Sequence, residues 1–514
     1  MFAASNTKGW LFSRALLFLG ALLSILWSGY FAVVTISIPY QIELREGAAQ
    51  VMTDFLLSRT NPFVFEHQPL AMNNYGLGYN LVVTPFAALL GNTLSVHRSV
   101  TFVFILLSSL VGFIVVYKTK KEIASSAACA AFIMIGLMGR GGIGAFPSAL
   151  GTFLFMLTIL VPFLKGFDRT SLLLSILFSV AAFHSKAYFV LGFGVVASYL
   201  FLFVSKKTGL FYSALFLILV AISFLAARLI FPLYILDTII ANISNTDRSF
   251  AHLVAQLAQL WAYFFPVLLS FLFFLIFGKE KVDPAGRAFN IWDLEQPLLR
   301  PSLNYLFYSS MCALLAFLLF LGSHIGSYLN YVYQLILPLF FCWVFSEVDL
   351  RKKISIPLVI AVLFNLFFWG KDMISPQMLE QRDSREWARL YSYVQSSSNI
   401  LNSPVITSKM IELGLNPLDS GQTSYFYSVE PYPNNAIFGP SYETFHADGL
   451  RYIKFIDNSV EKQKFDLVVT TAEKSTFYHA KLIEKFYVPV DEIKVDMPQT
   501  GQQWTVLLWR PLSK

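Results

Sequence analysis

The chain has 514 residues, of which 56% are hydrophobic and only 13% are charged. Soluble globular proteins carry about 25% charged residues, and one chain of this length cannot bury so much apolar surface in a water-soluble core. The formal net charge of +7 is therefore expected to serve membrane topology and not nucleic-acid binding. These values predict an integral membrane protein and exclude an ordinary soluble enzyme.

Several site types are excluded by missing motifs. The three cysteines, Cys129, Cys312 and Cys342, lie inside apolar runs, which argues against a disulfide framework or a thiolate metal site. The sequence contains no Walker A loop, so it does not predict an ATPase. It contains no HExxH motif and no clustered Cys/His set, so a structural zinc site is not expected. A GxSxG elbow is absent too. We expect no cofactor.

Long apolar runs recur from the N-terminus to about residue 370, and most reach the roughly 17–25 residues that a spanning helix needs. The predicted spans are 15–38, 99–117, 123–140, 148–164, 170–186, 187–204, 210–232, 255–277, 305–322, 332–346 and 354–370. The first run continues through Ser28-Gly29 into further apolar residues, so we expect an anchor and not a cleaved signal peptide. The fold class predicted for this part is an all-α polytopic membrane domain of about eleven spans.

Whether the segment 77–91 crosses the membrane determines on which side each later loop lies. It is short for a span and contains Asn80 and Pro85, so we interpret it as a juxtamembrane helix at the interface. With that choice the basic loops 118–122, 165–169, 205–208, 278–304 and 351–353 all lie on the side of Lys8 and Arg14. This one-sided distribution is what the positive-inside rule requires, and it predicts a cytoplasmic N-terminus.

Two external regions follow from this topology. Residues 39–98 form a long first external loop of the membrane domain 1–370, and residues 371–514 form a soluble extracytoplasmic domain that holds more than half of the acidic residues. Within the latter, strands are predicted at 404–407, 465–470 and 504–509, and helices at 384–397 and 473–486. The prediction is a small C-terminal α/β domain.

Ionisable and polar groups stand at the external ends of the spans and in the external loops. Those singled out are Glu43, Glu46, Arg140, Lys186, Arg248, His324, Asn330 and Tyr331. A carboxylate at the membrane surface suits general-base work, although solvated surface residues are the commoner case. Each basic side chain could also extend to the membrane interface only to keep its charged group in water. Their accumulation on one face instead suggests a pocket for a lipid phosphate.

The pattern resembles the GT-C type glycosyltransferases, the polytopic superfamily that includes protein O-mannosyltransferases and the lipid A aminoarabinose transferase. The resemblance rests on an acidic motif after the first span (Glu43–Gly47), an Asn-Pro-aromatic element at 61–63, and an element from Gln68 to Gly76. A juxtamembrane helix ending in Gly91 to Arg98, a late external Asn330-Tyr331 pair and the external C-terminal domain complete it.

The resemblance implies a polyprenyl-phosphate sugar donor, an acidic first-loop residue as base, and inversion at the anomeric carbon. Carried onto this chain, Glu46 is the first candidate for the base and Glu43 the second. The donor phosphate is assigned to Lys186, Arg140, Arg248 and His324, and the sugar site to Tyr75 and Asn74, with Arg98, Asn330 and Tyr331 as further binding residues. Many relatives carry an acidic residue where this chain reads Phe146-Pro147-Ser148, so no metal is expected.

Three other functions stay open at this point: a transporter or lipid flippase, a non-catalytic membrane protein with a ligand-binding external domain, and a ligase or polymerase of lipid-linked glycans. The chain shows none of the internal repeats typical of transporters. The partners expected are membrane lipids, the donor, and a glycan, lipid or protein acceptor. The expected location is a bacterial-type inner membrane, with the endoplasmic reticulum as the alternative.

Overall fold

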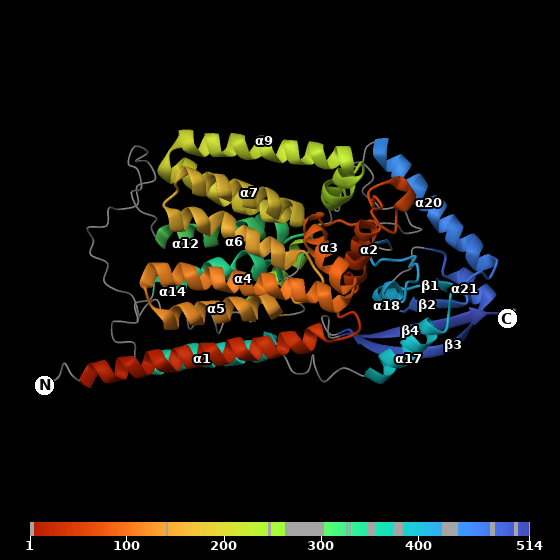
Figure 1. The fold of residues 1–514 in the computed structure, drawn as a ribbon, viewed down its shortest axis with the longest axis horizontal. Coiled ribbons are helices and arrows are strands. Elements are labelled where there is room, and N and C mark those ends of the chain that lie inside the picture. Colours follow the sequence, from red (N-terminus) through yellow and green to blue (C-terminus); the bar gives the residue numbers. More distant parts are fainter. Residues whose placement is uncertain are drawn as a thin grey trace.

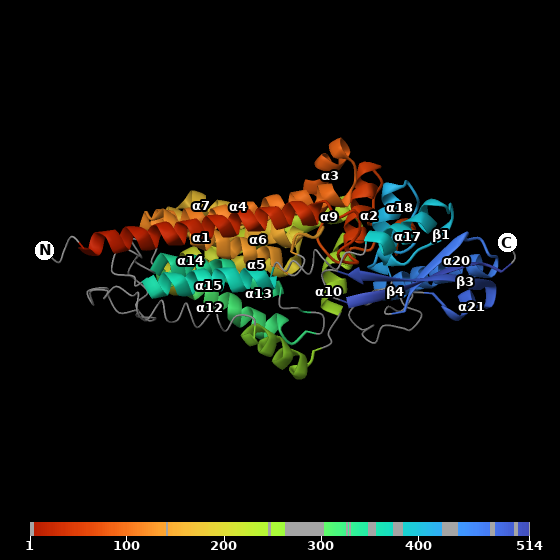
Figure 2. The same ribbon diagram turned by 90° about the horizontal axis from the view of Figure 1, so that it is seen from below.

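The computed structural model describes residues 5–139, 142–244, 248–262, 303–324, 327, 330–347, 356–373, 384–423, 440–472, 478–497 and 502–512. A bundle of long helices occupies one end of the molecule, and a small sheet with its own helices occupies the other (Figure 1). Figure 2, turned by 90°, shows the same division, with the N-terminus and the C-terminus at opposite ends.

The helices of the bundle follow the apolar runs of the sequence. They are α1 (Ser5–Ile36), α4 (Leu94–Lys120), α5 (Ile123–Met138), α6 (Ser148–Lys165), α7 (Arg169–Ser185), η3 (Ala187–Val190), α8 (Leu191–Tyr199), η4 (Leu200–Val204), α9 (Lys206–Ile230), α12 (Leu303–Ala316), η6 (Phe317–Leu321), α13 (Asn330–Leu335), α14 (Leu337–Glu347) and α15 (Ile356–Met373). Every predicted span other than 255–277 coincides with one or more of these elements, and residues 263–277 lie outside the described ranges. Six helical stretches among the described residues are long and apolar enough to cross a membrane, so the chain is a multi-pass membrane protein.

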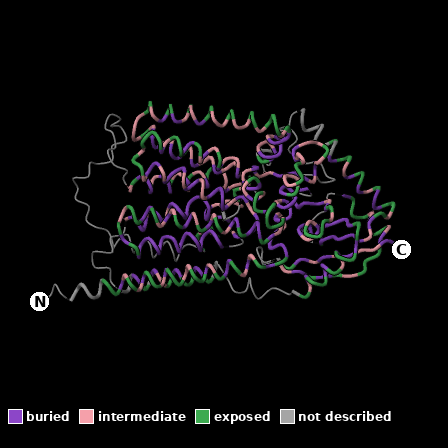
Figure 3. Tube along the Cα trace, in the orientation of Figure 1, coloured by how far each residue is buried: buried purple, intermediate pink, exposed green. Residues whose placement is uncertain are grey.

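The centre of the bundle is α5, nearly all of whose residues are buried. Its first half is rich in alanine and serine, and such small side chains let neighbouring helix backbones approach closely. It packs against α1, α4 and α14. At the periphery, α1 and α9 expose leucine, isoleucine and phenylalanine side chains, as helices that face lipid do. Figure 3 shows exposed residues along both helices.

The segment 39–98, predicted as the first external loop, contains helices of its own. They are α2 (Glu46–Leu57), η1 (Phe65–His67) and α3 (Gly78–Leu90). The structure confirms 77–91 as a short separate helix, with Leu89 83% and Leu90 69% exposed, as expected at a lipid interface. Two further elements, η5 (Leu236–Ile240) and α10 (Ala241–Ser244), follow α9 and pack beside this loop.

The C-terminal region is a three-layer α/β structure. Its elements are α17 (Ser384–Gln395), β1 (Ile400–Leu401), η7 (Pro404–Ile406), α18 (Thr407–Glu412), α20 (Pro440–Glu461), β2 (Leu467–Thr471), α21 (Lys481–Phe486), β3 (Tyr487–Met497) and β4 (Gln502–Pro511). The sheet order is β1-β2-β4-β3, with β1 parallel to β2 and the other pairs antiparallel. One face of the sheet packs on α17 and on Ile38, Tyr40 and Ile42 of the first loop, and the other packs on α20 and α21.

Some predicted elements of this region were wrong. Residues 404–407, predicted as a strand, form η7 and the start of α18, because Pro404 lacks the N–H that a strand ladder needs and suits the first turn of a helix instead. Of the predicted helix 473–486, residues 473–477 lie outside the described ranges, and only 481–486 are helical. The strands at 465–470 and 504–509 and the helix at 384–397 are confirmed with small shifts of their ends.

Candidate active site

Glu46 begins α2 and is fully buried. Its Oε1 accepts hydrogen bonds from Arg98 Nε at 2.9 Å and from the Ala145 N–H at 2.9 Å. Its Oε2 accepts from Arg98 Nη2 at 2.7 Å and from the Ile42 N–H at 2.8 Å. A carboxylate has about four acceptor positions, so the carboxylate of Glu46 has no position left for a substrate proton.

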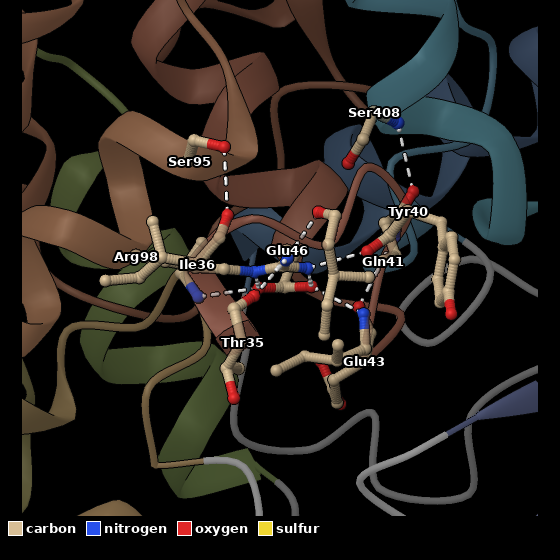
Figure 4. Close-up of polar contacts among 12 residues, drawn as sticks. Thr35, Ile36, Tyr40, Gln41, Glu43, Glu46, Ser95, Arg98 and Ser408 are labelled. Atoms are coloured by element: carbon tan, nitrogen blue, oxygen red, sulfur yellow. Dashed lines mark hydrogen bonds and ion pairs between the residues drawn. The ribbon is translucent and has the colours of Figure 1, made fainter. Parts of the chain in front are cut away.

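Arg98 is equally enclosed, with an exposed fraction of 0%. Besides Glu46, its guanidinium donates to the carbonyl oxygens of Thr35 (3.2 Å), Ile38 (2.8 Å) and Tyr40 (2.7 Å). Figure 4 shows the pair beside Thr35 and Ile36, where α1 ends. Such a satisfied buried pair holds the backbone in place, and it leaves Arg98 no donor for a phosphate.

Glu43 lies three residues earlier and has a different environment. Its side chain is 11% exposed and pairs with Arg45, whose Nε lies 2.5 Å from Oε1. The Arg45 N–H donates to Oε2 at 2.6 Å. Two of about four acceptor positions are therefore occupied by described residues, and the carboxylate retains room for a further donor.

Arg45 joins Glu43 to the next part of the site. Its Nη1 donates to Tyr75 Oη at 2.8 Å, and its Cζ lies 5.5 Å from the centre of the Phe146 ring. Phe146 is the first residue of the Phe146-Pro147-Ser148 segment, in which this chain has no acidic residue. An aromatic ring therefore lies against the Arg45 guanidinium on this side.

Lys186 completes the cluster from the break between α7 and η3, outside both helices. Its Nζ lies 4.6 Å, 5.0 Å and 5.2 Å from the ring centres of Tyr75, Tyr188 and Tyr331. Burial and, to a smaller extent, the charge of Arg45 lower the pKa of Lys186 to about 7, and Glu43 offsets part of this effect. An incoming anion would favour the charged ammonium.

A close backbone contact sets Tyr75 beside Lys186. A Cβ on Gly76 would lie 1.7 Å from the His184 carbonyl oxygen, and one on Gly78 would lie 3.0 Å from Ser185 Oγ. The loop that carries Tyr75 therefore lies directly on the end of α7. No side chain fits at residue 76 without moving this contact.

The remaining candidates have other described partners or lie outside the described ranges. Asn74 precedes Tyr75 of the cluster, and it forms hydrogen bonds with Gln422 and Asn242. Arg248 and His324 form an antiparallel bridge with each other. Arg140 lies outside the described residues, as does the side chain of Asn330, which begins α13.

The structure thus brings together Glu43, Tyr75, Lys186 and Tyr331 of the predicted residues, adds Arg45, Phe146 and Tyr188, and separates Glu46 and Arg98 from them. Tyr188 could have been found from its position two residues after Lys186, and Arg45 from its place inside the acidic motif. Among the described residues, no group of three or more His, Cys, Asp and Glu side chains is placed to hold a metal.

Comparison with known proteins shows the fold. No protein-family model and no curated protein matches the chain. Two crystal structures of ArnT from Cupriavidus metallidurans do, one bound to undecaprenyl phosphate (TM-score 0.58) and one in the apo state (TM-score 0.56). In both cases the identity is 10%, and the match covers 95% of this chain and 97% of that chain.

The chain has the ArnT fold. Because the match covers nearly the whole of both chains, it includes the membrane bundle, the first loop and the C-terminal α/β region together. The GT-C type architecture expected from the sequence is therefore confirmed for the fold. The identity of 10% carries no residue assignment, so the roles of individual side chains rest on the geometry above.

Proposed function

We propose that this protein is a membrane glycosyltransferase that moves a sugar from a polyprenyl-phosphate donor to an extracytoplasmic hydroxyl acceptor, with inversion. The observation that carries the proposal is the cluster of Glu43, Arg45 and Lys186 at the end of the bundle that meets the C-terminal region. The cluster combines two cationic groups with one carboxylate that can accept a further hydrogen bond. ArnT, whose fold this chain shares, was solved bound to undecaprenyl phosphate.

The two cations suit the phosphate of the donor. Arginine and lysine are the usual partners of phosphate groups, and the net charge of the three-residue cluster is positive. Preorganised cations stabilise the charge that develops on a leaving phosphate. In this proposal Lys186 and Arg45 hold the phosphate, and the polyprenyl tail lies along the lipid-facing side of the bundle.

Glu43 is the general base in this mechanism. It takes the proton of the acceptor hydroxyl as the acceptor oxygen bonds to the anomeric carbon. The bond from that carbon to the phosphate oxygen breaks, and polyprenyl phosphate leaves with both electrons. The sequence favours Glu46 as the base and places Glu43 second. We prefer Glu43, because the carboxylate oxygens of Glu46 already accept four hydrogen bonds, whereas Glu43 can still accept one from the substrate hydroxyl.

The position of the cluster favours a transferase over a transporter. Transporters of the repeat-based folds place their substrate site near the middle of the membrane. Here the cluster lies at the ends of α1 and α7, against the external loop. We propose accordingly that residues 1–370 form the membrane domain in an inner membrane, that the N-terminus is cytoplasmic, and that residues 371–514 lie outside.

Transfer from labelled donors tests the proposal. The purified protein in nanodiscs would receive polyprenyl phosphates carrying radiolabelled hexoses or pentoses together with an envelope extract as acceptor. We expect wild type to transfer label, and Glu43→Gln to lose roughly 10²–10⁴-fold in rate, the usual contribution of a general base. Wild-type rates in Glu43→Gln would contradict the assignment of the base, and no transfer from any donor by wild type would count against the activity itself.

A further inference from the structure

A short segment of the C-terminal region lies against the candidate active site. It comprises residues 419–423 (Asp-Ser-Gly-Gln-Thr), between α18 and α20, and we call it the strap. All five residues are buried, although four of them have polar side chains. Their partners lie in the first external loop and within the C-terminal region itself.

The strap meets the turn that carries Glu43 and Arg45 through Gly421. This glycine has φ +92°, and a Cβ on it would lie 2.9 Å from the Leu44 carbonyl oxygen. Asp419 accepts a hydrogen bond from the Gly421 N–H at 2.8 Å, which holds this conformation. The backbone of the strap therefore lies directly against the residue between Glu43 and Arg45.

The strap meets the other half of the site through Gln422. Its Oε1 accepts a hydrogen bond from the Asn74 N–H at 2.8 Å, and Asn74 precedes Tyr75, one of the three tyrosines around Lys186. Thr423 Oγ1 adds a longer bond to the Pro69 carbonyl oxygen at 3.4 Å. The same five residues thus contact both the Glu43 turn and the Tyr75 loop.

Gln41 supplies a second connection to the Glu43 turn. It is fully buried, and its Nε2 donates to the carbonyl oxygens of Glu43 at 3.3 Å and Leu44 at 3.0 Å. Its Oε1 accepts from the Ser408 N–H at the start of α18 at 3.0 Å (Figure 4). The turn is therefore bonded to the C-terminal region through its backbone, while its side chains face the cluster.

The strap is itself fixed to the sheet through Asn402, which follows β1. Asn402 Nδ2 donates to the Asp419 carbonyl oxygen at 2.8 Å, and its Oδ1 accepts from the Leu418 and Asp419 N–H groups at 2.7 Å and 3.1 Å. Thr407 Oγ1 donates to the same Asp419 carbonyl oxygen at 2.6 Å. Four hydrogen bonds with Asn402 and Thr407 therefore hold the start of the strap to the α/β region.

We propose that the strap is a positioning element of the active site, which sets the Glu43 turn and the Tyr75 loop beside Lys186 at their working separation. The name "active site" rests on the proposed transferase function. Gln422 is the positioning residue that this geometry identifies, because its side chain bonds the strap to the residue next to Tyr75. A misplacement of reacting groups by about 1 Å lowers rates by as much as about 100-fold.

The test compares Gln422→Met, which keeps the length of the side chain and loses the acceptor, with Gln422→Glu, which keeps the acceptor oxygen. Gln503→Ala, at an exposed position of β4, is the matched control. Two quantities are measured in nanodiscs: the rate of sugar transfer, and hydrogen exchange of the backbone amides at 41–47 and 73–77. Thr423→Val provides a second strap variant if Gln422→Met does not fold.

We expect Gln422→Met to lower kcat by roughly 10- to 100-fold and to speed amide exchange at both segments, with Gln422→Glu recovering most of the loss and Gln503→Ala unchanged. Transfer and exchange at wild-type values in Gln422→Met would overturn the proposal, as would equal losses in the Glu and Met variants. If wild type transfers no sugar, the proposed function fails, and amide exchange alone then decides whether the strap holds the two segments.

Discussion

At the scale of single residues, two glutamates three positions apart have opposite environments. Glu46 is fully buried and bound by Arg98 and two backbone N–H groups, whereas the Glu43 side chain is 11% exposed and is bound by the side chain and the N–H of Arg45. The sequence placed both near the membrane surface but could not separate them, because the difference depends on Arg98 of α4, 52 residues away. The environment of Lys186 also depends on distant parts of the chain, because two of its three tyrosine neighbours, Tyr75 and Tyr331, come from other segments.

The Glu46–Arg98 pair should contribute to stability. Removing one partner of a buried ion pair leaves an uncompensated charge, which typically costs about 3–5 kcal/mol. We expect Glu46→Gln to lower the melting temperature in detergent strongly, and Glu43→Gln to lower it less, because the Arg45 side chain is 36% exposed and its charge can be solvated. Thermal unfolding followed by tryptophan fluorescence checks this. Equal melting temperatures for the two variants would show that the buried Glu46–Arg98 pair contributes no more to stability than the Glu43–Arg45 pair.

The pKa of Lys186, about 7 because of burial and the charge of Arg45, predicts a pH dependence of phosphate binding. Below pH 7 the ammonium is already charged, so protonation adds nothing further. Above pH 7 the free protein carries a neutral amine, and binding a phosphate must take up a proton. The affinity for polyprenyl phosphate should therefore fall by up to about tenfold per pH unit above 7.

Lys186→Arg is the control for this dependence, because an arginine side chain stays charged throughout the range. Isothermal titration between pH 6.5 and 9 in nanodiscs measures both proteins. The decline above pH 7 should be present in wild type and absent in Lys186→Arg. A decline of the same size in both proteins would assign it to another group.

At the scale of elements, the site depends on how the first loop lies on the end of α7. The sequence predicted α3 and the helices of the bundle, because apolar composition is a local property. It did not predict β3 or α20. β3 carries Asp491, Glu492, Lys494 and Asp496 around its buried residues Ile493 and Val495, and this charge obscures the strand pattern. The parallel pairing of β1 with β2 is a long-range contact without a local signal.

Gly76→Ala tests the contact between the Tyr75 loop and α7. The new Cβ would lie 1.7 Å from the His184 carbonyl oxygen, a backbone atom that cannot rotate away. We expect Tyr75 to move from Lys186 and the transfer rate to fall by roughly 10- to 100-fold. Gly194→Ala is the matched control, because a Cβ at residue 194 would meet no atom within 4 Å among the described residues. Comparable rates in both variants would mean that the loop adapts without consequence for the site.

At the scale of the whole molecule, the proposed function requires the two ends to lie on opposite sides of the membrane. The α4–α5 turn lies at the N-terminal end of the bundle, where Arg14 Nε is 3.3 Å from Glu122 Oε1. The C-terminal sheet lies at the other end (Figure 1). From the positive-inside rule we propose that the N-terminal end of the bundle faces the cytoplasm.

Cysteine labelling in a background without Cys129, Cys312 and Cys342 checks this orientation. Ser392→Cys of α17 and Lys207→Cys at the start of α9 are both at exposed positions. An impermeant maleimide should label the former in intact spheroplasts and the latter only after lysis. The reverse pattern would invert the topology and place the candidate site on the cytoplasmic side.

The central claim is that the cluster around Lys186 binds the phosphate of a polyprenyl carrier, and direct binding of polyprenyl phosphate tests it without knowledge of the sugar. Wild type would be compared with Lys186→Met, and with Lys485→Met as a control, since Lys485 also lies over an aromatic ring but in the C-terminal region. We predict that wild type binds, that Lys186→Met loses roughly 10- to 100-fold in affinity, as expected for one charge-assisted contact, and that Lys485→Met is unchanged. Equal affinity in wild type and Lys186→Met, or no binding by wild type, would contradict the claim.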